Sequence, residues 1–284
     1  MIEISKNKSK DKVKKRKKPA RRANELDGSQ WVKNSISIWS DARFTSEERK
    51  LKHPAMFPQA LIEKLIKTFT NKNQKVILDP FCGSGSTIVA AEKLGKTGIG
   101  IELYPKFIQL ANKRLAEVVP STEMINSKII KGDSRNLHKY LEKNSVDLSI
   151  TSPPYWDILK QRRTADNKDA EHYGENIADL GNYSGYNDFL IELGKTFSSV
   201  NYALKQEGYF IVNVMDLRKG PKFFPLHMDI VPVAIDAGFY LDDIIIWDRR
   251  LDYNNLRALG YPAVFRINKV HEFLMIFRKR IIEV

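Results

Sequence analysis

The segment from Val76 to Leu94 constrains the fold of this chain most strongly, because it places a strand, a glycine loop and a helix in direct succession. The run 76–78 is short and wholly apolar, which is typical of a strand buried on both faces of a sheet. A loop with Gly83 and Gly85 follows, and apolar residues then recur at helical spacing as far as Leu94. Since such a strand needs helices over both faces, the segment predicts an α/β protein.

The same alternation of buried strands and helices continues along the chain. Further strands are expected at 97–101, 129–130, 146–150, 208–215, 239–247 and 270–277. Further helices are expected at 61–69, 105–119, 189–204 and 228–237. Strands that alternate with helices imply right-handed crossovers and a parallel sheet that is covered on both faces.

Polar side chains stand where four of the expected strands end. They are Asp79, Glu102, Asp133 and Ser152. In parallel α/β sheets, ligands bind at the carboxyl ends of the strands. The sequence therefore predicts a ligand site at this edge of the sheet.

The turn 151–155 is a stiff, acceptor-rich segment at that same edge. Pro153 and Pro154 must end the preceding strand, because neither residue donates a backbone N–H group. The turn offers carbonyl oxygens, the Ser152 hydroxyl and the Tyr155 ring, which suit an NH2 group on a flat ring. Taken alone, the turn is better explained as a rigid loop, but its place beside three other polar strand ends favours a binding role.

The glycine loop indicates a nucleoside cofactor that needs no phosphate site. A dinucleotide-binding loop requires a third glycine where this chain has Ile88, and a phosphate-binding loop requires a lysine that is absent here. Glu102 follows Gly83 by 19 residues, the spacing of an acid that binds ribose hydroxyls. Asp133 is then placed to accept a hydrogen bond from an adenine amino group. S-adenosylmethionine satisfies these conditions.

The positive charge of the chain is concentrated at its N-terminus. The net charge is +13, and residues 1–22 carry eleven Lys or Arg and two acids, which leaves +4 for the remainder. We expect 1–25 to be a disordered basic tail, which either binds polyanions or aids solubility.

No apolar run suggests a secretory signal or a membrane span, and the single cysteine, Cys82, fits a reducing compartment, so a cytoplasmic location is expected.

Three motifs together resemble the amino-methyltransferases that modify exocyclic amines of DNA bases. The segments 79–87 and 152–155 resemble the paired signature of that family, and 53–58 resembles the segment that packs against the methionine end of its cofactor. The resemblance implies a Rossmann-like methyltransferase fold with a mostly parallel seven-stranded sheet and helices on both faces. It also implies S-adenosylmethionine as the cofactor and no metal.

The resemblance assigns roles to particular residues. The implied catalytic residues are Ser152, Pro153, Pro154 and Tyr155. The implied cofactor-binding residues are His53, Phe57, Asp79, Pro80, Phe81, Gly83, Gly85, Glu102 and Asp133.

The expected chemistry follows from the weak nucleophilicity of a base amine, whose lone pair is delocalised into the ring. We expect the Pro153 carbonyl and the Ser152 hydroxyl to accept hydrogen bonds from the amine, while Tyr155 stacks on the base. The amine then attacks the sulfonium methyl group in line, aided by positioning and electrostatics. A target base within double-stranded DNA must be flipped out to reach the pocket.

The identity of residue 152 predicts the target base. Family members with Asp or Asn at this position mostly methylate adenine N6, whereas Ser-Pro-Pro-Tyr resembles members that methylate cytosine N4. We therefore expect cytosine N4. The alternatives are adenine N6, RNA or a glutamine side chain as the acceptor, and a nucleic-acid-binding subunit without activity. A nicotinamide oxidoreductase is excluded by Ile88.

The chain departs from many relatives in its organisation. The cofactor segment precedes the catalytic segment, and no separate target-recognition domain is evident, so we expect one methyltransferase domain over 26–284. Loops at 156–187 and 249–268 are the expected DNA-contacting segments. A cognate restriction endonuclease is a candidate partner, and the sequence leaves the oligomeric state open.

Five apolar side chains are expected to dock the segment 31–48 on the core: Trp31, Ile36, Ile38, Trp39 and Phe44.

Overall fold

The expected α/β sheet is present in the computed structural model, which describes residues 23–51, 56–119, 124–158, 174–252, 263–264 and 266–281. The sheet has eight strands in the order β1-β9-β10-β6-β5-β2-β3-β4. In this order their bounds are Ile38–Trp39, Phe239–Asp248, His271–Lys279, Leu204–Val214, Val146–Thr151, Val76–Asp79, Thr97–Glu102 and Lys128–Lys131. The seven strands β2 to β6, β9 and β10 correspond to the expected seven-stranded sheet. The eighth, β1, has only two residues, too few to show any periodicity in the sequence.

All pairings in the sheet are parallel except those of β10, which runs antiparallel to both β6 and β9. From β2 the chain proceeds outward through β3 to β4, and then returns to the other side of β2 to form β5 and β6. The strand order therefore reverses between β2 and β5. In parallel α/β sheets this switch point opens a crevice at the carboxyl ends of the two strands, and here those ends carry Asp79 and Thr151.

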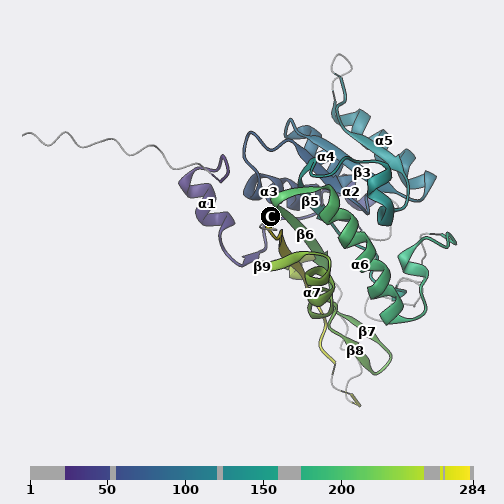
Figure 1. The fold of residues 1–284 in the computed structure, drawn as a ribbon. Helices are drawn as coiled ribbons and strands as arrows, with labels where there is room; N and C mark the ends of the chain where they lie inside the picture. The colour runs from purple at the N-terminus through teal and green to yellow at the C-terminus, as the bar shows by residue number, and fades with distance from the viewer. Residues whose placement is uncertain are drawn as a thin grey trace, which may run out of the picture.

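Helices cover both faces of the sheet (Figure 1). The long helices are α3 (Gln59–Phe69), α4 (Ser86–Lys93), α5 (Pro105–Val118), α6 (Tyr186–Ala203) and α7 (Leu226–Asp236). Short helices complete the chain: α1 (Gly28–Asn34), α2 (Ser46–Lys50), and the 3-10 turns η1 (Ser134–Lys139), η3 (Leu180–Asn182) and η4 (Arg250–Asp252). No helix among the described residues combines the length and the apolar character needed to cross a membrane.

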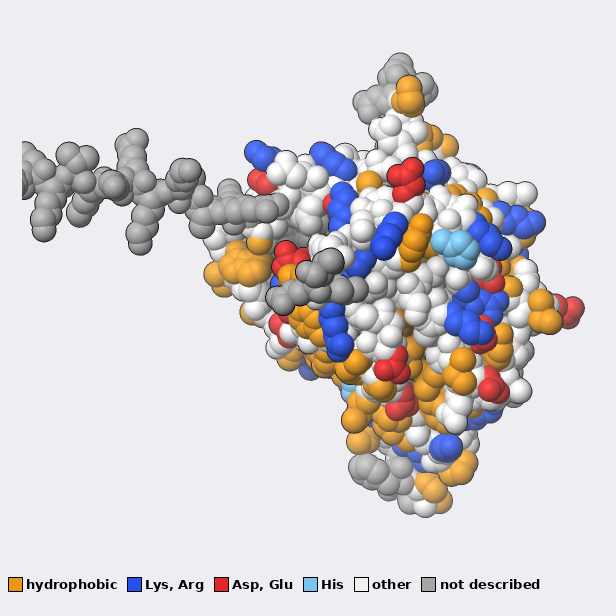
Figure 2. Space-filling view, in the orientation of Figure 1, with side chains coloured by type: hydrophobic (Ala, Val, Ile, Leu, Met, Phe, Trp, Pro, Cys, Tyr) orange, Lys and Arg blue, Asp and Glu red, His pale blue; other side chains and the backbone are white. Residues whose placement is uncertain are grey.

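A separate two-stranded ribbon follows β6. It consists of β7 (Leu217–Lys219) and β8 (Lys222–Phe224), which pair antiparallel and project at one end of the molecule (Figure 1). Lysine and arginine side chains lie among hydrophobic ones at this end (Figure 2). The sequence analysis did not anticipate these strands, because three residues are too short a run to show alternation.

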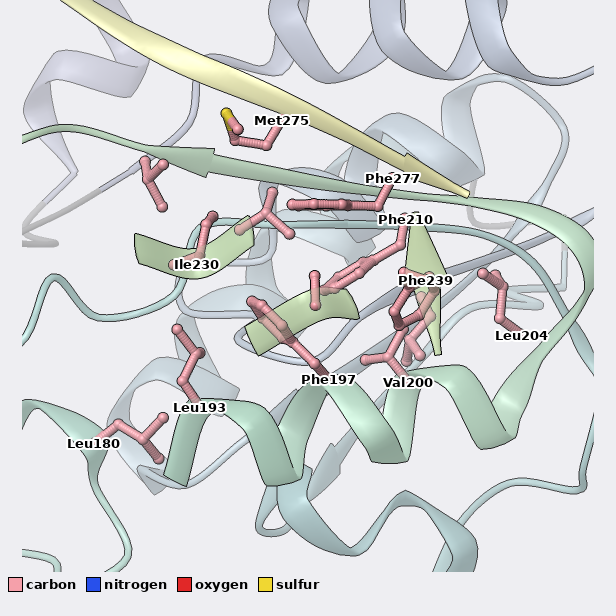
Figure 3. Packing of buried hydrophobic residues seen from close by; sticks show 14 of the residues in the cluster. Leu180, Leu193, Phe197, Val200, Leu204, Phe210, Ile230, Phe239, Met275 and Phe277 are labelled. Carbon is pink, nitrogen blue, oxygen red and sulfur yellow. The ribbon is translucent and has the colours of Figure 1, made fainter. Parts of the chain in front are cut away.

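Two apolar layers lie on opposite faces of the sheet, as period-two side-chain alternation requires. Neighbouring residues of β2 separate accordingly, since Ile77 belongs to the cluster beneath α3 and Leu78 to the cluster beneath α6. In the α6 layer, the Phe197 and Phe210 ring centroids lie 5.0 Å apart in an edge-to-face arrangement, and Phe239 lies 5.1 Å from Phe210 (Figure 3). These layers hold the strand ends in fixed relative positions.

The segment 31–48 is more regular than expected, since it forms α1, β1 and the start of α2. Trp39 is fully buried and Phe44 packs beside the core, as expected. The expectation was wrong for Trp31, Ile36 and Ile38, which are about half exposed (46%, 53% and 55%). For Ile38 the reason is strand alternation, because β1 turns Trp39 inward and its neighbour outward.

Several expectations fall on residues outside the described ranges. They are the basic tail up to residue 22, His53, and the parts 159–173, 253–262 and 265 of the two expected DNA-contacting loops. The structure gives no account of these residues.

Gly100 on β3 allows the glycine loop to pack against the sheet. A Cβ atom at this position would lie 2.4 Å from the Cys82 sulfur and 2.9 Å from the Cys82 Cβ. We predict that Gly100→Ala lowers the free energy of unfolding by about 1–3 kcal/mol, the usual cost of overpacking. Urea denaturation measures this change. Gly28→Ala is the matched control, because nothing lies within 4 Å of a Cβ there.

The double variant Cys82→Ala/Gly100→Ala tests the cause. It should recover part of the lost stability, since the closest clashing atom is removed. Additive effects of the two substitutions would contradict the proposed clash.

Candidate active site

A cavity with an empty volume of about 780 Å³ opens at the carboxyl ends of the parallel strands. The predicted residues that line it are Phe57, Asp79, Pro80, Phe81, Gly83, Glu102, Asp133, Ser152 and Pro154. The structure therefore brings together side chains from strand ends that are far apart in the sequence. Three other predicted residues, Gly85, Pro153 and Tyr155, do not line the cavity.

Asp79 joins three segments at the base of the cavity. Its carboxylate accepts hydrogen bonds from the Phe81 backbone N–H (3.0 Å), the Thr87 hydroxyl (2.6 Å) and the Thr151 hydroxyl (2.8 Å). These donors belong to the glycine loop, to α4 and to the end of β5. The side chain is 4% exposed, and burial raises its pKa to about 6 although the three donors act in the opposite direction.

Glu102 fixes the glycine loop against the end of β3. One carboxylate oxygen accepts from the Gly83 backbone N–H at 2.8 Å, and the other accepts from the Tyr104 backbone N–H at 2.9 Å. Burial raises the pKa of this carboxyl group. Each oxygen keeps a lone pair, so Glu102 can also accept hydrogen bonds from ribose hydroxyl groups. Its role in ribose binding stays a prediction.

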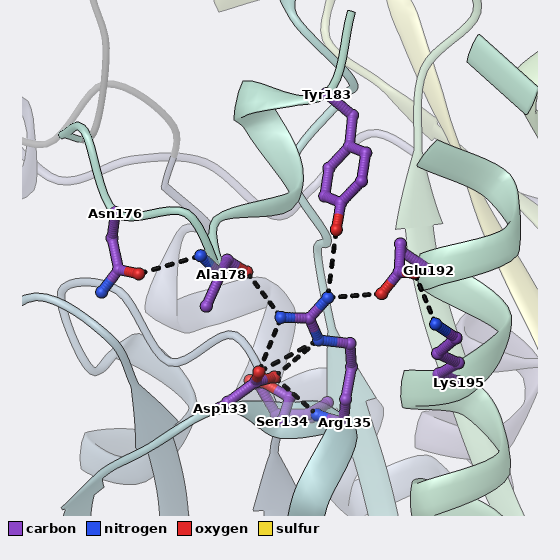
Figure 4. A network of polar contacts seen from close by, with 9 residues as sticks. Asp133, Ser134, Arg135, Asn176, Ala178, Tyr183, Glu192 and Lys195 are labelled. Atoms are coloured by element: carbon purple, nitrogen blue, oxygen red, sulfur yellow. Dashed lines mark hydrogen bonds and ion pairs between the residues drawn. The ribbon is translucent and has the colours of Figure 1, made fainter. Parts of the chain in front are cut away.

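The carboxylate of Asp133 is held by Arg135 (Figure 4). The Arg135 Nη2 atom lies 2.7 Å from Oδ2, and Nε lies 3.0 Å from both carboxylate oxygens. Arg135 also contacts Glu192 and the Tyr183 hydroxyl. Its hydrogen bonds to Asp133, and then those to Glu192 and Tyr183, raise the pKa of its guanidinium. Arg135 thus uses most of the acceptor capacity of Asp133. The predicted contact to an adenine amino group stays a prediction.

The turn 151–155 is connected to two neighbouring strands through the Tyr155 hydroxyl. This hydroxyl lies 3.0 Å from Ser152 Oγ, from Asn213 Nδ2 and from a carboxylate oxygen of Glu272. Asn213 on β6 is 1% exposed and Glu272 on β10 is 5% exposed. The second oxygen of Glu272 pairs with Arg249.

Hydrogen-bond roles in this network follow from the charges. A carboxylate only accepts, so Tyr155 donates its proton to Glu272, and the Tyr155 oxygen accepts from Ser152 and Asn213. Burial, together with the Glu272 charge, raises the pKa of Tyr155 well above its usual value and keeps this proton in place. Ser152 therefore donates its only proton within the protein. No donor among the described residues uses its lone pairs, so both can accept a hydrogen bond from a group in the cavity.

The residue after the turn has an unusual backbone conformation. Trp156 has a φ of +51°, in the left-handed region that non-glycine residues seldom adopt. Its buried ring lies 5.2 Å from Tyr186 and 5.1 Å from Phe224, and its Nε1 atom donates to the Tyr183 carbonyl at 2.9 Å. Contacts with α6 and with the β7–β8 ribbon therefore hold the turn in place.

The sequence analysis missed four residues of the site. Tyr104 and Asp179 both line the cavity, and the Tyr104 hydroxyl donates to Asp179 at 2.7 Å. Asn213 and Glu272 support the turn from behind. A signal for Asn213 was present, because it is a lone polar residue in the apolar run 210–214 of β6, whereas Glu272 follows His271 at the start of β10 and gave a weaker signal. Asp179 carries no such signal in its polar loop.

The lining residues favour a ligand without phosphate groups. They include four carboxylates, Asp79, Glu102, Asp133 and Asp179, and no Lys or Arg occurs among the described residues that line the cavity. The rings of Phe57 and Phe81 offer apolar surface, beside that of Tyr104. A neutral or cationic nucleoside therefore fits this lining better than a nucleotide does, and S-adenosylmethionine, with its sulfonium and amino groups, is such a ligand.

Comparisons with known proteins agree with this geometry. A family model for DNA methylases that act on N6 and N4 amines matches residues 1–113 and 146–282. Over 89 residues the chain is 42% identical to Type II methyltransferase M.ScaI of Streptomyces caespitosus, covering 29% of each chain. Over 95 residues it is 39% identical to Type II methyltransferase M.HinfI of Haemophilus influenzae, covering 31% of this chain and 26% of the relative. The matched parts thus span less than a third of these relatives.

Among solved structures, an S-adenosylmethionine-dependent methyltransferase from Methanosarcina mazei matches with a TM-score of 0.47 at 15% identity. The match covers 73% of this chain and 93% of the other.

The raised pKa of Asp79 predicts a pH-dependent contribution to stability. The pKa is about 6 in the folded protein and 3.8 ordinarily, so the folded state binds the proton more tightly. The resulting stabilisation is complete below about pH 4 and is lost as the pH rises through 6. Compared with Asp79→Asn, the wild-type protein should gain about 1 kcal/mol of unfolding free energy between pH 7 and pH 5. Urea denaturation at both pH values measures this gain, and an unchanged difference would contradict it.

Proposed function

Because the chain belongs to the N6/N4 DNA methylase family, we propose that it transfers a methyl group from S-adenosylmethionine to N4 of a cytosine in double-stranded DNA. The observation that carries this proposal is a cavity bordered by both the glycine loop and Ser152, with no Lys or Arg among the described residues that line it. We further propose that residues 26–284 act as one catalytic domain, since the described strands form one sheet apart from the β7–β8 ribbon.

The cofactor would be held by the residues that line the cavity. Glu102 would accept hydrogen bonds from the ribose hydroxyls, and Phe57 and Phe81 would supply apolar contacts. The bound cofactor supplies an electrophilic methyl group on a sulfonium. Nearby carboxylates, among them the buried Asp79 and Asp179, favour a positive charge in this space.

The methyl-acceptor turn would activate the amine by accepting its hydrogen bonds. Ser152 acts as the donor in its contact with Tyr155, and none of the described residues donates to it, so both of its lone pairs can accept from the amine. Two acceptors, the Ser152 hydroxyl and the Pro153 carbonyl, would favour a pyramidal nitrogen whose lone pair is directed at the methyl group. Tyr155 is half-buried, with its hydroxyl inside the protein network, so stacking on the base would use the remaining face of its ring. The gain in rate would come from positioning and fixed dipoles.

Nucleoside analysis of methylated DNA tests the proposal. Purified protein is incubated in parallel with duplex DNA and with RNA of mixed sequence, each with labelled S-adenosylmethionine, and the nucleic acid is digested and analysed by mass spectrometry. We expect N4-methylcytosine from the wild-type protein and at least a tenfold slower reaction from Ser152→Ala with an unchanged cofactor Kd. Exclusive N6-methyladenine would overturn the choice of base, and label in RNA alone would overturn the choice of DNA.

Glu272 is proposed as a positioning residue that acts through Tyr155. Glu272→Gln retains the size of the side chain but weakens the acceptor for the Tyr155 proton. We predict a kcat about tenfold lower, equivalent to about 1.4 kcal/mol of activation free energy, with no change in the cofactor Kd. The double variant Tyr155→Phe/Glu272→Gln should be no slower than Tyr155→Phe, because both changes break the same contact. Additive losses would show that Glu272 acts by another route.

A further inference from the structure

The β7–β8 ribbon leaves the sheet beside the methyl-acceptor turn. It follows β6, whose Val212 pairs with Thr151, so β6 ends at the same edge of the sheet as Ser152. The two short strands pair through Leu217 with Phe224 and Arg218 with Phe223, and they are joined by the exposed turn Gly220-Pro221. The ribbon therefore reaches outward from the proposed catalytic edge.

One face of the ribbon is anchored in the protein. Leu217 and Phe224 are buried, and the Phe224 ring lies 5.1 Å from Trp156. On the same face, Lys219 lies 4.2 Å from the Trp156 ring centroid and forms an ion pair with Asp157. These contacts fix the ribbon directly to the residues that follow the turn, so its position relative to Ser152 is defined.

The exposed side chains of the ribbon are cations and one aromatic side chain. Arg218 and Phe223 lie on the face opposite Phe224, and Phe223 is 38% exposed. Lys222 is exposed beside the turn on the same face as Phe224, with its ammonium 4.8 Å from the Phe224 ring centroid. The segment that runs beside the ribbon adds Lys269, whose ammonium lies 5.2 Å from the Phe223 ring centroid, and Arg266, which reaches the Gly220 carbonyl at 3.5 Å. None of these four cations forms an ion pair within the part of the chain that the structure describes.

We propose that this ribbon binds the sugar-phosphate backbone and groove of a DNA duplex, with Arg218 and Lys222 on phosphates. The proposal rests on the proposed function and adds a substrate-contacting element to it. The four cations without an ion pair among the described residues suit a polyanionic ligand. Contacts from such cations to phosphates hold a duplex in position. A two-stranded ribbon also fits the major groove of B-DNA, which is about 12 Å wide. The exposed Phe223 between the cations gives the ribbon an apolar surface for base edges or sugars.

The salt dependence of DNA binding tests the proposal. Each phosphate contact to B-DNA adds about 0.9 to the slope of log K against log salt concentration. Arg218→Ala/Lys222→Ala should therefore reduce the magnitude of the slope by about 2, measured by fluorescence anisotropy with a labelled duplex. The control Lys93→Ala/Lys113→Ala removes the same charge from exposed positions on α4 and α5, at the far end of the molecule (Figure 1), and should leave the slope unchanged.

Two further measurements separate the outcomes. Both double variants should retain the wild-type cofactor Kd, since none of the four residues lines the cavity. If the wild-type protein methylates DNA and both double variants share its slope, the ribbon proposal alone is overturned. If the wild-type protein binds no DNA duplex, the ribbon proposal and the proposed function both fail. If an RNA duplex binds more tightly and loses the same slope in Arg218→Ala/Lys222→Ala, the choice of DNA is wrong.

Discussion

The buried carboxylate of Asp79 is the interaction on which the geometry of this site depends. It stands at the point where the strand order reverses, and it is bonded to the glycine loop, to the first turn of α4 and to the last residue of β5. A charge in this position is costly, as its raised pKa indicates, but each of its three donors belongs to a different wall of the cavity. The proposed cofactor site and the proposed acceptor site are therefore parts of one hydrogen-bonded structure.

Much of the fold could be predicted because its signals are local. Apolar runs such as 76–78 and 146–150 identify buried strands, and the two prolines after Ser152 identify the end of β5. The parallel arrangement then places their ends at one edge without any knowledge of contacts. For this reason Glu102 and Ser152, 50 residues apart, could be assigned to the same site.

What the sequence could not show are contacts between strands that are distant along the chain. Glu272 reaches Tyr155 across 117 residues, and the pairing depends on β10 entering the sheet antiparallel beside β6. Asp133 shows a second kind of contact that the sequence does not predict. Its place at a strand end was evident, but its pairing with Arg135 two residues later depends on side-chain geometry that spacing does not reveal. The short ribbon β7–β8 escaped notice because its strands have only three residues each.

The left-handed conformation of Trp156 bears on how the Ser-Pro-Pro-Tyr motif is understood. A non-glycine residue in this region costs about 1–2 kcal/mol, and here the cost is offset by packing against Tyr186 on α6 and Phe224 on the ribbon. A short peptide with the same sequence lacks these neighbours and would relax to an ordinary backbone conformation. The shape of the turn is thus a property of the folded domain and is not encoded by the motif alone.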